Sequence, residues 1–585
     1  MAVKSKQASR SLRLNTEIAE IPVGKHTRQK EKVAKSGSTL YYGDNLSVLR
    51  DHIPSSSVDL VYLDPPFNSN ANYNVLFSSP KGHKSGAQIE AFDDTWHWGE
   101  EAEKEFSEIL TQPNTQVSEV MRSLRQFLGE NDMMAYLVMM ANRLLELHRA
   151  LKDTGSLYLH CDTTASHYLK ILLDGIFGVE NFRNEIVWKR NSAHSDGKQG
   201  ARHFGRVTDS ILFYTKSASS TFHTLYRPYD QHYIDRDYRR IAKDGRRYRL
   251  DNIQGPGGAE NGNPFYEVMG VSRYWRYTRE KMDKLISEGR IIQTSPGTVP
   301  QYKRYLDEMP GVSIQNLWDD IPVINNRSNE VMGYPTQKPL ALLERIISVS
   351  SNAGDVILDP FCGCGTAVHA SQMLGRRWIG IDVTHLAISL VEKRLNDAFP
   401  GIDFEVHGTP KDYEGARDLA GRDKYQFQWW ACSLVNAQPY GGKKKGADGG
   451  VDGLIFFQDD KGISKKIIVS VKGGENVGVT MVKDLIATLA RQKAEIGLFV
   501  TLNAPTKPMI AEAVSAGFYK NPSGATFPRI QILEVADLIS GARSARYPRM
   551  DAGSLTFKKT AVELGEDKQP DLFGGVSGKR KKRGK

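Results

Sequence analysis

Two adjacent prolines end a buried strand near the start of this chain. Val58 to Leu63 is a mostly apolar, β-branched run, typical of a strand buried in a parallel sheet. Asp64, Pro65, Pro66 and Phe67 follow at once. A proline has no N–H for the sheet, so the strand must stop there. Because Pro66 also keeps Pro65 out of the helical region, the turn is stiff.

This turn places a carboxylate and a fixed carbonyl side by side at the end of the strand. Together, the Asp64 side chain and the Pro65 carbonyl can accept both hydrogens of an exocyclic amine, which localises the lone pair on nitrogen. Phe67 offers a face for a planar base. The alternative is a plain Pro-Pro turn with a capping aspartate, so the rest of the chain must decide between the two.

A second pattern, 295 residues downstream, predicts a nucleoside site. A strand at Asp355–Asp359 leads into a glycine turn at Pro360–Thr366, a helix at Ala367–Leu374 and a strand at Arg377–Asp382. The acid that ends this last strand lies 19 residues after Gly363. Glycines let a nucleoside approach the backbone, and the acid reaches ribose hydroxyls. The turn lacks the longer pyrophosphate pattern, which favours S-adenosylmethionine over a dinucleotide.

Two further stretches belong to the same arrangement. Leu40–Asp44 reads as a short strand that ends 20 residues before Asp64. Neighbouring strands of a doubly wound sheet present their carboxyl ends to one ligand, so Asp44 is expected near the same site. Tyr334–Pro339 opens a helix at Leu340–Val349 and is expected to close over that ligand.

The paired motifs resemble those of the amino-group DNA methyltransferases, in the β arrangement in which the catalytic motif precedes the cofactor motif. The closest likeness is to modification subunits of type III restriction systems, and it covers roughly residues 38–408. The resemblance implies an α/β fold with a permuted, seven-stranded Rossmann-like sheet. It also implies double-stranded DNA as substrate, a flipped target base and S-adenosylmethionine as methyl donor.

Site residues follow from the same resemblance, motif by motif. The catalytic residues are Asp64, Pro65, Pro66 and Phe67. The expected cofactor residues are Phe361, Gly363, Gly365 and Asp382, with Asp44, Asp359, Thr366 and Lys338 near the adenosine and methionine ends. Family members with aspartate at the first catalytic position usually methylate adenine N6, whereas serine is typical of cytosine N4 enzymes. Asp64 therefore favours adenine, with N4-cytosine methylation as the alternative.

Residues 218–330 change character, because arginines alternate with tyrosines from Tyr226 to Arg249 and again at Arg273–Tyr277. Such a pattern can grip phosphates and stack on bases. The alternative is a solvated arginine-rich surface with aromatics packed beneath. The resemblance places the target-recognition region here.

A second domain follows, and its strand Ile467–Lys472 resembles the Mrr-type restriction endonuclease domain of the PD-(D/E)XK fold. In that family, carboxylates hold a divalent metal and a lysine orients the attacking water. Asp452 and Lys472 match the pattern, and Asp448 is a second candidate ligand for Mg²⁺. Ser470 stands where the family has an acid or glutamine, and serine is a poor Mg²⁺ ligand. An active nuclease and a degenerate DNA-binding module both stay open.

Charge and composition complete the organisation of the chain. The net charge of +10 sits at the ends: residues 1–36 and Lys579–Lys585 carry +6 each, so the remainder carries −2. Two basic ends on a neutral body favour a polyanionic partner. Four cysteines indicate a reducing compartment, and hence a cytoplasmic, nucleoid-associated protein. The predicted parts are a basic arm (1–36), a methyltransferase domain (37–408, with target recognition at about 218–330), a linker (409–425), an endonuclease-type domain (426–547) and a basic tail (548–585).

The sequence therefore predicts a prokaryotic DNA adenine N6 methyltransferase with a nuclease-like domain, from a restriction–modification or related system. The alternatives are a bifunctional enzyme that also cleaves DNA, a nuclease with a dead methyltransferase region, and a non-catalytic DNA-binding protein. In the tail, Gln569–Phe573 resembles peptides that dock on bacterial sliding clamps, although a chance Leu-Phe pair would look the same. No apolar run is long enough to span a membrane, so no membrane partner is expected. A homodimer is left open.

Overall fold

The computed structural model describes residues 37–66, 96–191, 202–325, 328, 330–332, 334, 336–440, 450–459 and 464–548, and the backbone alone of 72–78 and 84–93. The basic arm, the basic tail with its Gln569–Phe573 motif, and the predicted site residues Phe67 and Asp448 lie outside these described residues. No helix in the described part combines the length and the apolar character needed to cross a bilayer.

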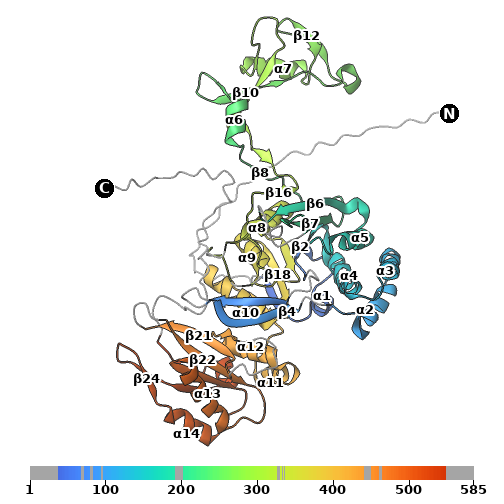
Figure 1. Ribbon diagram of the computed structural model, residues 1–585. Coiled ribbons are helices and arrows are strands. Elements are labelled where there is room, and N and C mark those ends of the chain that lie inside the picture. The colour runs from blue at the N-terminus through green and yellow to red at the C-terminus, as the bar shows by residue number, and fades with distance from the viewer. Residues whose placement is uncertain are drawn as a thin grey trace, which may run out of the picture. The chain divides into compact units, whose positions relative to one another are not determined.

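A nine-stranded sheet forms the centre of the larger part of the chain (Figure 1), in the order β16-β6-β7-β5-β2-β17-β18-β1-β19. Its strands are β1 (Thr39–Tyr42), β2 (Val58–Leu63), β5 (Leu151–Cys161), β6 (Phe182–Lys189), β7 (Thr208–Thr215), β16 (Leu317–Trp318), β17 (Val356–Asp359), β18 (Arg377–Asp382) and β19 (Glu405–His407). All neighbouring pairs are parallel except those made by β7, which runs antiparallel to β5 and β6. The predicted α/β fold is confirmed. The sheet has two more strands than the expected seven.

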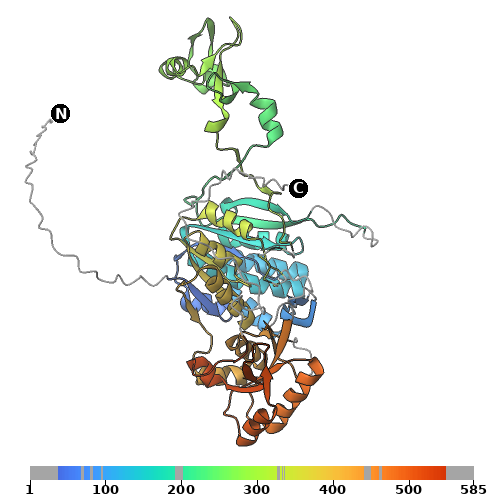
Figure 2. The same ribbon diagram turned by 90° about the vertical axis from the view of Figure 1, so that its left-hand side faces the viewer.

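Helices cover both faces of this sheet (Figure 2), and β2 serves both sides. Its alternate residues point to opposite faces, as in any strand. Val61 and Leu63 pack in a core that includes α4, whereas Leu60 and Tyr62 pack in a core that includes α8. The helices are α1 (Asn45–His52), α2 (Glu100–Leu110), α3 (Thr115–Leu128), α4 (Asp132–Ala150), α5 (Ser166–Phe177), α8 (Leu340–Ser350), α9 (Thr366–Met373) and α10 (His385–Ala398), with the 3₁₀ turn η1 (Val179–Asn181). A separate antiparallel pair joins β3 (Asn72–Ser78) to β4 (Lys84–Asp93).

The segment predicted for target recognition folds as a small lobe, drawn in green in Figure 1, with its own core around Trp275. Its four-stranded sheet has the order β13-β14-β10-β9. Its elements are β8 (Tyr226–Arg227), α6 (Gln231–Asp237), β9 (Arg240–Ile241), β10 (Arg247–Asn252), η3 (Gly258–Asn261), β11 (Phe265–Val268), β12 (Val271–Tyr274), α7 (Arg279–Ser287), β13 (Ile291–Ile292), β14 (Gln301–Tyr305), η4 (Leu306–Glu308) and β15 (Val312–Ser313).

Ion pairs occupy part of the arginine pattern in this lobe. Three arginines pair with acids of the lobe itself: Arg246 with Asp307, Arg247 with Asp235 and Arg249 with Asp251. Others of the pattern are exposed, namely Arg239, Arg240, Arg273 and Arg276. The exposed set is therefore the one available to phosphates.

The C-terminal part has a five-stranded sheet in the order β20-β21-β22-β23-β26. Its elements are α11 (Tyr413–Arg422), α12 (Lys424–Leu434), β20 (Gln438–Pro439), β21 (Gly453–Gln458), β22 (Ser464–Lys472), α13 (Val479–Gln492), β23 (Ile496–Thr501), α14 (Lys507–Ser515), β24 (Phe518–Lys520), β25 (Thr526–Pro528), β26 (Ile530–Glu534) and α15 (Val535–Ser540). The segment predicted as a linker contains α11, whose Ala416 and Leu419 are buried in the core of this C-terminal part.

A buried carboxylate ties three central strands together at their amino ends. Asp59 of β2 accepts two hydrogen bonds from Lys152 Nζ of β5, both at 2.8 Å. It also accepts one from the backbone N–H of Val356 of β17, at 2.9 Å. Such charge-assisted bonds hold β2 in one position between its neighbours.

We expect Asp59→Ala to lower the free energy of unfolding by about 2–3 kcal/mol, because it leaves a half-buried lysine and a strand N–H without their acceptor. The shift of the urea midpoint measures this loss. Asp418→Ala is the control, since the Asp418–Arg422 pair is exposed and exposed pairs contribute at most about 1 kcal/mol. Equal shifts for the two variants would contradict a bracing role for Asp59.

Candidate active site

A cavity of about 690 Å³ opens at the carboxyl edge of the four strands β1, β2, β17 and β18. Four carboxylates, one just after or at the end of each strand, line it: Asp44, Asp64, Asp359 and Asp382. The parallel register makes this convergence, because Leu60 and Val61 of β2 pair with Ile357 and Leu358 of β17. The structure thus brings together the two motifs that the sequence places 295 residues apart.

Asp64 forms an ion pair with Lys338 in the wall of this cavity. Both side chains are largely buried, at 15% and 11% exposed. Lys338 Nζ also lies within hydrogen-bonding distance of the Thr336 carbonyl, at 3.4 Å. The sequence placed Lys338 near the cofactor ends, whereas the structure places its ammonium on the expected catalytic carboxylate. Pro65 and Pro66 line the cavity beside it.

A buried polar network, not predicted from the sequence, lies behind Asp64. The Tyr62 hydroxyl and His160 Nδ1 are 3.1 Å apart, and His160 Nε2 lies 3.1 Å from Asp209 Oδ2. Arg190 approaches the other Asp209 oxygen at 3.2 Å. Burial, with a smaller contribution from nearby carboxylates, raises the pKa of Tyr62 well above its usual range, so the hydroxyl keeps its proton. The only sequence signal was a histidine and an aspartate inside otherwise apolar strands.

The glycine turn has room for a ligand only because it lacks side chains. A Cβ on Gly363 would lie 3.2 Å from the Tyr334 ring, and one on Gly365 would lie 2.8 Å from Val391. Both residues have positive φ, +48° and +74°, which glycine adopts without strain. Phe361 and Thr366 line the same cavity. A nucleoside can therefore approach this backbone closely, so the residues present fit S-adenosylmethionine.

Asp359 and Asp382 are both buried beside the turn. Burial raises the pKa of Asp359 well above its usual range, although its carboxylate accepts the Phe361 N–H at 3.1 Å. Burial also raises the pKa of Asp382, to about 6, against the opposing hydrogen bonds from Thr384 and Gly363. Asp382 accepts the Gly363 N–H and the Thr384 N–H, each at 2.9 Å. It thereby joins the turn to β18 and also faces the ligand cavity.

Asp44 has a structural role as well as a place in the cavity wall. It caps helix α1 by accepting the Ser47 N–H at 3.0 Å, and its other oxygen pairs with Arg143 at 2.8 Å. Arg143 is itself buried and donates to Asn45 at 2.5 Å. Arg143 therefore fixes this corner of the cavity, and sequence reasoning had not singled it out.

Three residues from outside the predicted domain also line the cavity. Asp423, Gln426 and Trp429 belong to helix α12 and its N-cap. The sequence assigned them to the linker and the C-terminal domain. Their contribution depends on how α12 packs, which local patterns do not show.

In the C-terminal part, the two candidate nuclease residues do come together. Lys472 Nζ lies 3.5 Å from Asp452 Oδ2 and donates to Ser470 Oγ at 2.9 Å. The same Asp452 oxygen accepts the Val471 N–H at 2.7 Å. Among the described residues, no group of three or more His, Cys, Asp or Glu side chains is placed to hold a metal ion. Asp452 is thus held mainly by neighbours of its own strand pair.

Two family models match the chain. One is described as DNA methylase, N6_N4_Mtase, and covers residues 58–393. The other is described as NACHT-associated inactive Restriction Endonuclease 1 and covers residues 434–532. This second match replaces the expected Mrr-type relationship with a family whose description calls it inactive.

Curated relatives resemble the region of the first match. The type II methyltransferase M.EcaI of Enterobacter cloacae is 28% identical over 64% of this chain and 72% of its own length. The type III enzyme StyLTI Mod subunit of Salmonella typhimurium is 25% identical over 57% of this chain, which spans about half (49%) of that protein. The DNA adenine methyltransferase YhdJ of Escherichia coli is 26% identical over 63% of this chain and 85% of its own.

The raised pKa of Asp382 predicts pH-dependent cofactor binding. Ribose hydroxyls donate to the ionised carboxylate, so the cofactor should bind this form better and affinity should rise as the pH increases through about 6. Calorimetric titration of S-adenosylmethionine at pH 5, 6, 7 and 8 measures the change, which should reach at most about tenfold per pH unit and flatten above pH 7.

Asp382→Asn is the matched control, because it keeps the shape of the group and removes its titration. The variant should bind more weakly and show a nearly flat profile over this range. A profile as steep as that of the wild type would assign the dependence to another group, with buried Asp359 the first to examine.

Proposed function

Since the chain belongs to the DNA methylase family N6_N4_Mtase, we propose that this S-adenosylmethionine-dependent DNA methyltransferase of restriction–modification type modifies adenine N6 of a flipped base in double-stranded DNA. The single observation that carries the proposal is the convergence of Asp64 and the glycine turn on one cavity. Bound S-adenosylmethionine supplies an activated methyl group, and every other requirement falls to the chain itself.

Asp64 and Pro65 would orient the acceptor nitrogen. The carboxylate accepts one amine hydrogen and the Pro65 carbonyl accepts the other, which directs the nitrogen lone pair toward the methyl group. Lys338 keeps a positive charge beside Asp64 and so favours the ionised, accepting form of the carboxyl. The amine gains a bond to carbon and must lose a proton, for which the Asp64 carboxylate is the nearest acceptor.

Adenine is favoured over cytosine by two observations. Asp64 stands at a position where family members that methylate cytosine N4 typically have serine. One relative similar over nearly its full length is named as a DNA adenine methyltransferase, although the family model itself covers both N6 and N4. The exposed arginines of the green lobe would hold the DNA backbone during recognition.

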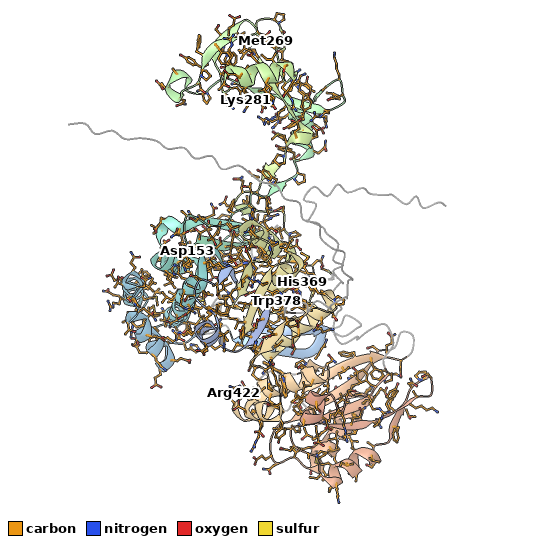
Figure 3. The ribbon with its side chains drawn as sticks, turned by 180° about the vertical axis from the view of Figure 1, so that it is seen from behind. Asp153, Met269, Lys281, His369, Trp378 and Arg422 are labelled. Carbon is orange, nitrogen blue, oxygen red and sulfur yellow. The ribbon has the colours of Figure 1, made fainter. Side chains whose placement is uncertain are left out.

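Asp64→Ala should reduce methyl transfer by at least about a hundredfold and leave S-adenosylmethionine affinity nearly unchanged, because Asp64 acts on the acceptor amine. Tritiated-methyl incorporation measures the rate, and mass spectrometry of digested DNA identifies the product. The control is Asp153→Ala, an exposed aspartate of β5 labelled in Figure 3, which should be as active as the wild type. N4-methylcytosine as the product would overturn the adenine proposal, and full activity of Asp64→Ala would remove Asp64 from the mechanism.

For the C-terminal domain we propose DNA binding without cleavage, independent of Mg²⁺. Asp452 is already engaged by Val471, Ser470 and Lys472, and Ser470 is too weak a ligand to complete a metal site. The second candidate is an active nuclease, which Asp452 and Lys472 alone would favour.

Plasmid nicking in millimolar Mg²⁺ distinguishes the two, with methyl transfer silenced by Asp64→Ala. We expect no cleavage above the level of a second variant that also carries Asp452→Ala. Cleavage that disappears with Asp452→Ala or Lys472→Ala would establish the nuclease instead. Ser470→Glu tests the reason: added cleavage in that variant would show that a missing ligand alone silences the site.

A further inference from the structure

Helix α12 packs in two cores at once. Phe427, Trp430 and Ala431 are buried with β22 in the C-terminal core. Trp429 is buried against Tyr334, Leu386 and Leu390 of the methyltransferase part. Residues three apart on a helix share a face, so Gln426 and Trp429, with the capping Asp423 one turn before, form one stripe. That stripe is the one that lines the cofactor cavity.

The polar residues of this stripe are fixed in position. Asp423 caps α12 through one oxygen, Oδ1, which accepts the N–H groups of Tyr425 at 2.9 Å and Gln426 at 3.1 Å. Gln426 Oε1 accepts the N–H of His385, the first residue of α10, at 3.1 Å. With these bonds made, Asp423 Oδ2 remains as an acceptor and Gln426 Nε2 as a donor at the cavity wall.

The surrounding residues place this wall at one end of the cavity. Gln426 bonds to the residue that follows Asp382, Val383 and Thr384 along the chain, and all three of these line the cavity. Val383 is apolar yet 58% exposed, so it offers an unoccupied face. Arg422, labelled in Figure 3, lies next to Asp423 and is close enough to His385 to lower the pKa of that buried ring.

This end corresponds to the base of the cofactor. The methyl group must lie beside Asp64, and the ribose beside Asp382, so the adenine lies beyond Asp382 and next to Val383. An adenine edge offers a hydrogen-bond donor at N6 and an acceptor at N1. Asp423 and Gln426 offer the matching acceptor and donor.

We propose that α12 recognises the adenine base of the cofactor, with Asp423 accepting from the N6 amine and Gln426 donating to N1. The inference rests on the proposed function, because it requires a bound adenosyl cofactor. It makes a helix of the nuclease-like domain part of the methyltransferase cofactor site, although α12 lies outside the residues that match the methylase family.

The experiment compares two ligands on the full-length protein by calorimetry: S-adenosylhomocysteine and S-inosylhomocysteine. Hypoxanthine reverses the edge, with an acceptor at position 6 and a donor at N1. The wild type should prefer the adenosyl ligand by about tenfold or more, because the inosyl edge leaves both protein groups mispaired. Gln426→Glu keeps an oxygen for the His385 N–H and replaces the donor with an acceptor, so the preference should fall by about tenfold or reverse.

Two further variants sharpen the result. Asp423→Asn keeps a good N-cap and supplies an amide donor, so it should also reduce the preference. Lys424→Ala, an exposed position on the same helix, should leave both affinities unchanged. An unchanged preference in both Gln426→Glu and Asp423→Asn would overturn the inference alone, whereas a wild type that binds neither ligand would overturn the proposed cofactor use as well.

Discussion

The parallel pairing of β2 with β17 is the constraint on which the site depends. Each strand is short and buried, and each ends in an Asp-Pro sequence that cannot continue the sheet. Their register brings the two turns to the same edge, although nearly three hundred residues separate them in sequence. Asp59 secures this register from the opposite end of the strands. The catalytic and cofactor motifs therefore meet because the backbone leaves them no other position.

Gathering four carboxylates around one cavity has an electrostatic cost, and the structure offsets it differently at each. Asp44 has Arg143, and Asp64 has Lys338. Asp382 relies on N–H groups of its own turn, and buried Asp359 has a raised pKa that favours its protonated form. Only two of the four thus have a cation as a direct partner. The charge of the cavity is consequently low enough to admit a cofactor, and its polar groups are already oriented.

The strand ends were predictable because β-branched runs followed by Pro or Gly are local signals. Asp64, Asp359 and Asp382 could be placed near one ligand on that basis. The position of Lys338 on Asp64 was not, since it depends on the path of a loop 274 residues away. The Tyr62–His160–Asp209 network likewise requires three strands in register. Near β22, the sequence identified Ser470 as the weak point, whereas only the structure shows how fully Asp452 is engaged.

Helix α12 also bears on how such a protein could be assembled from exchangeable parts. A gene fusion that attached a different C-terminal domain directly after β19 would remove Asp423, Gln426 and Trp429 from the wall of the cavity. A recombination point that preserves the wall has to lie beyond Leu434, inside what sequence alone defines as the second domain. The boundary that inheritance can cut is therefore displaced from the boundary between the two sheets, and a methylase without this helix must close its cavity with some other segment.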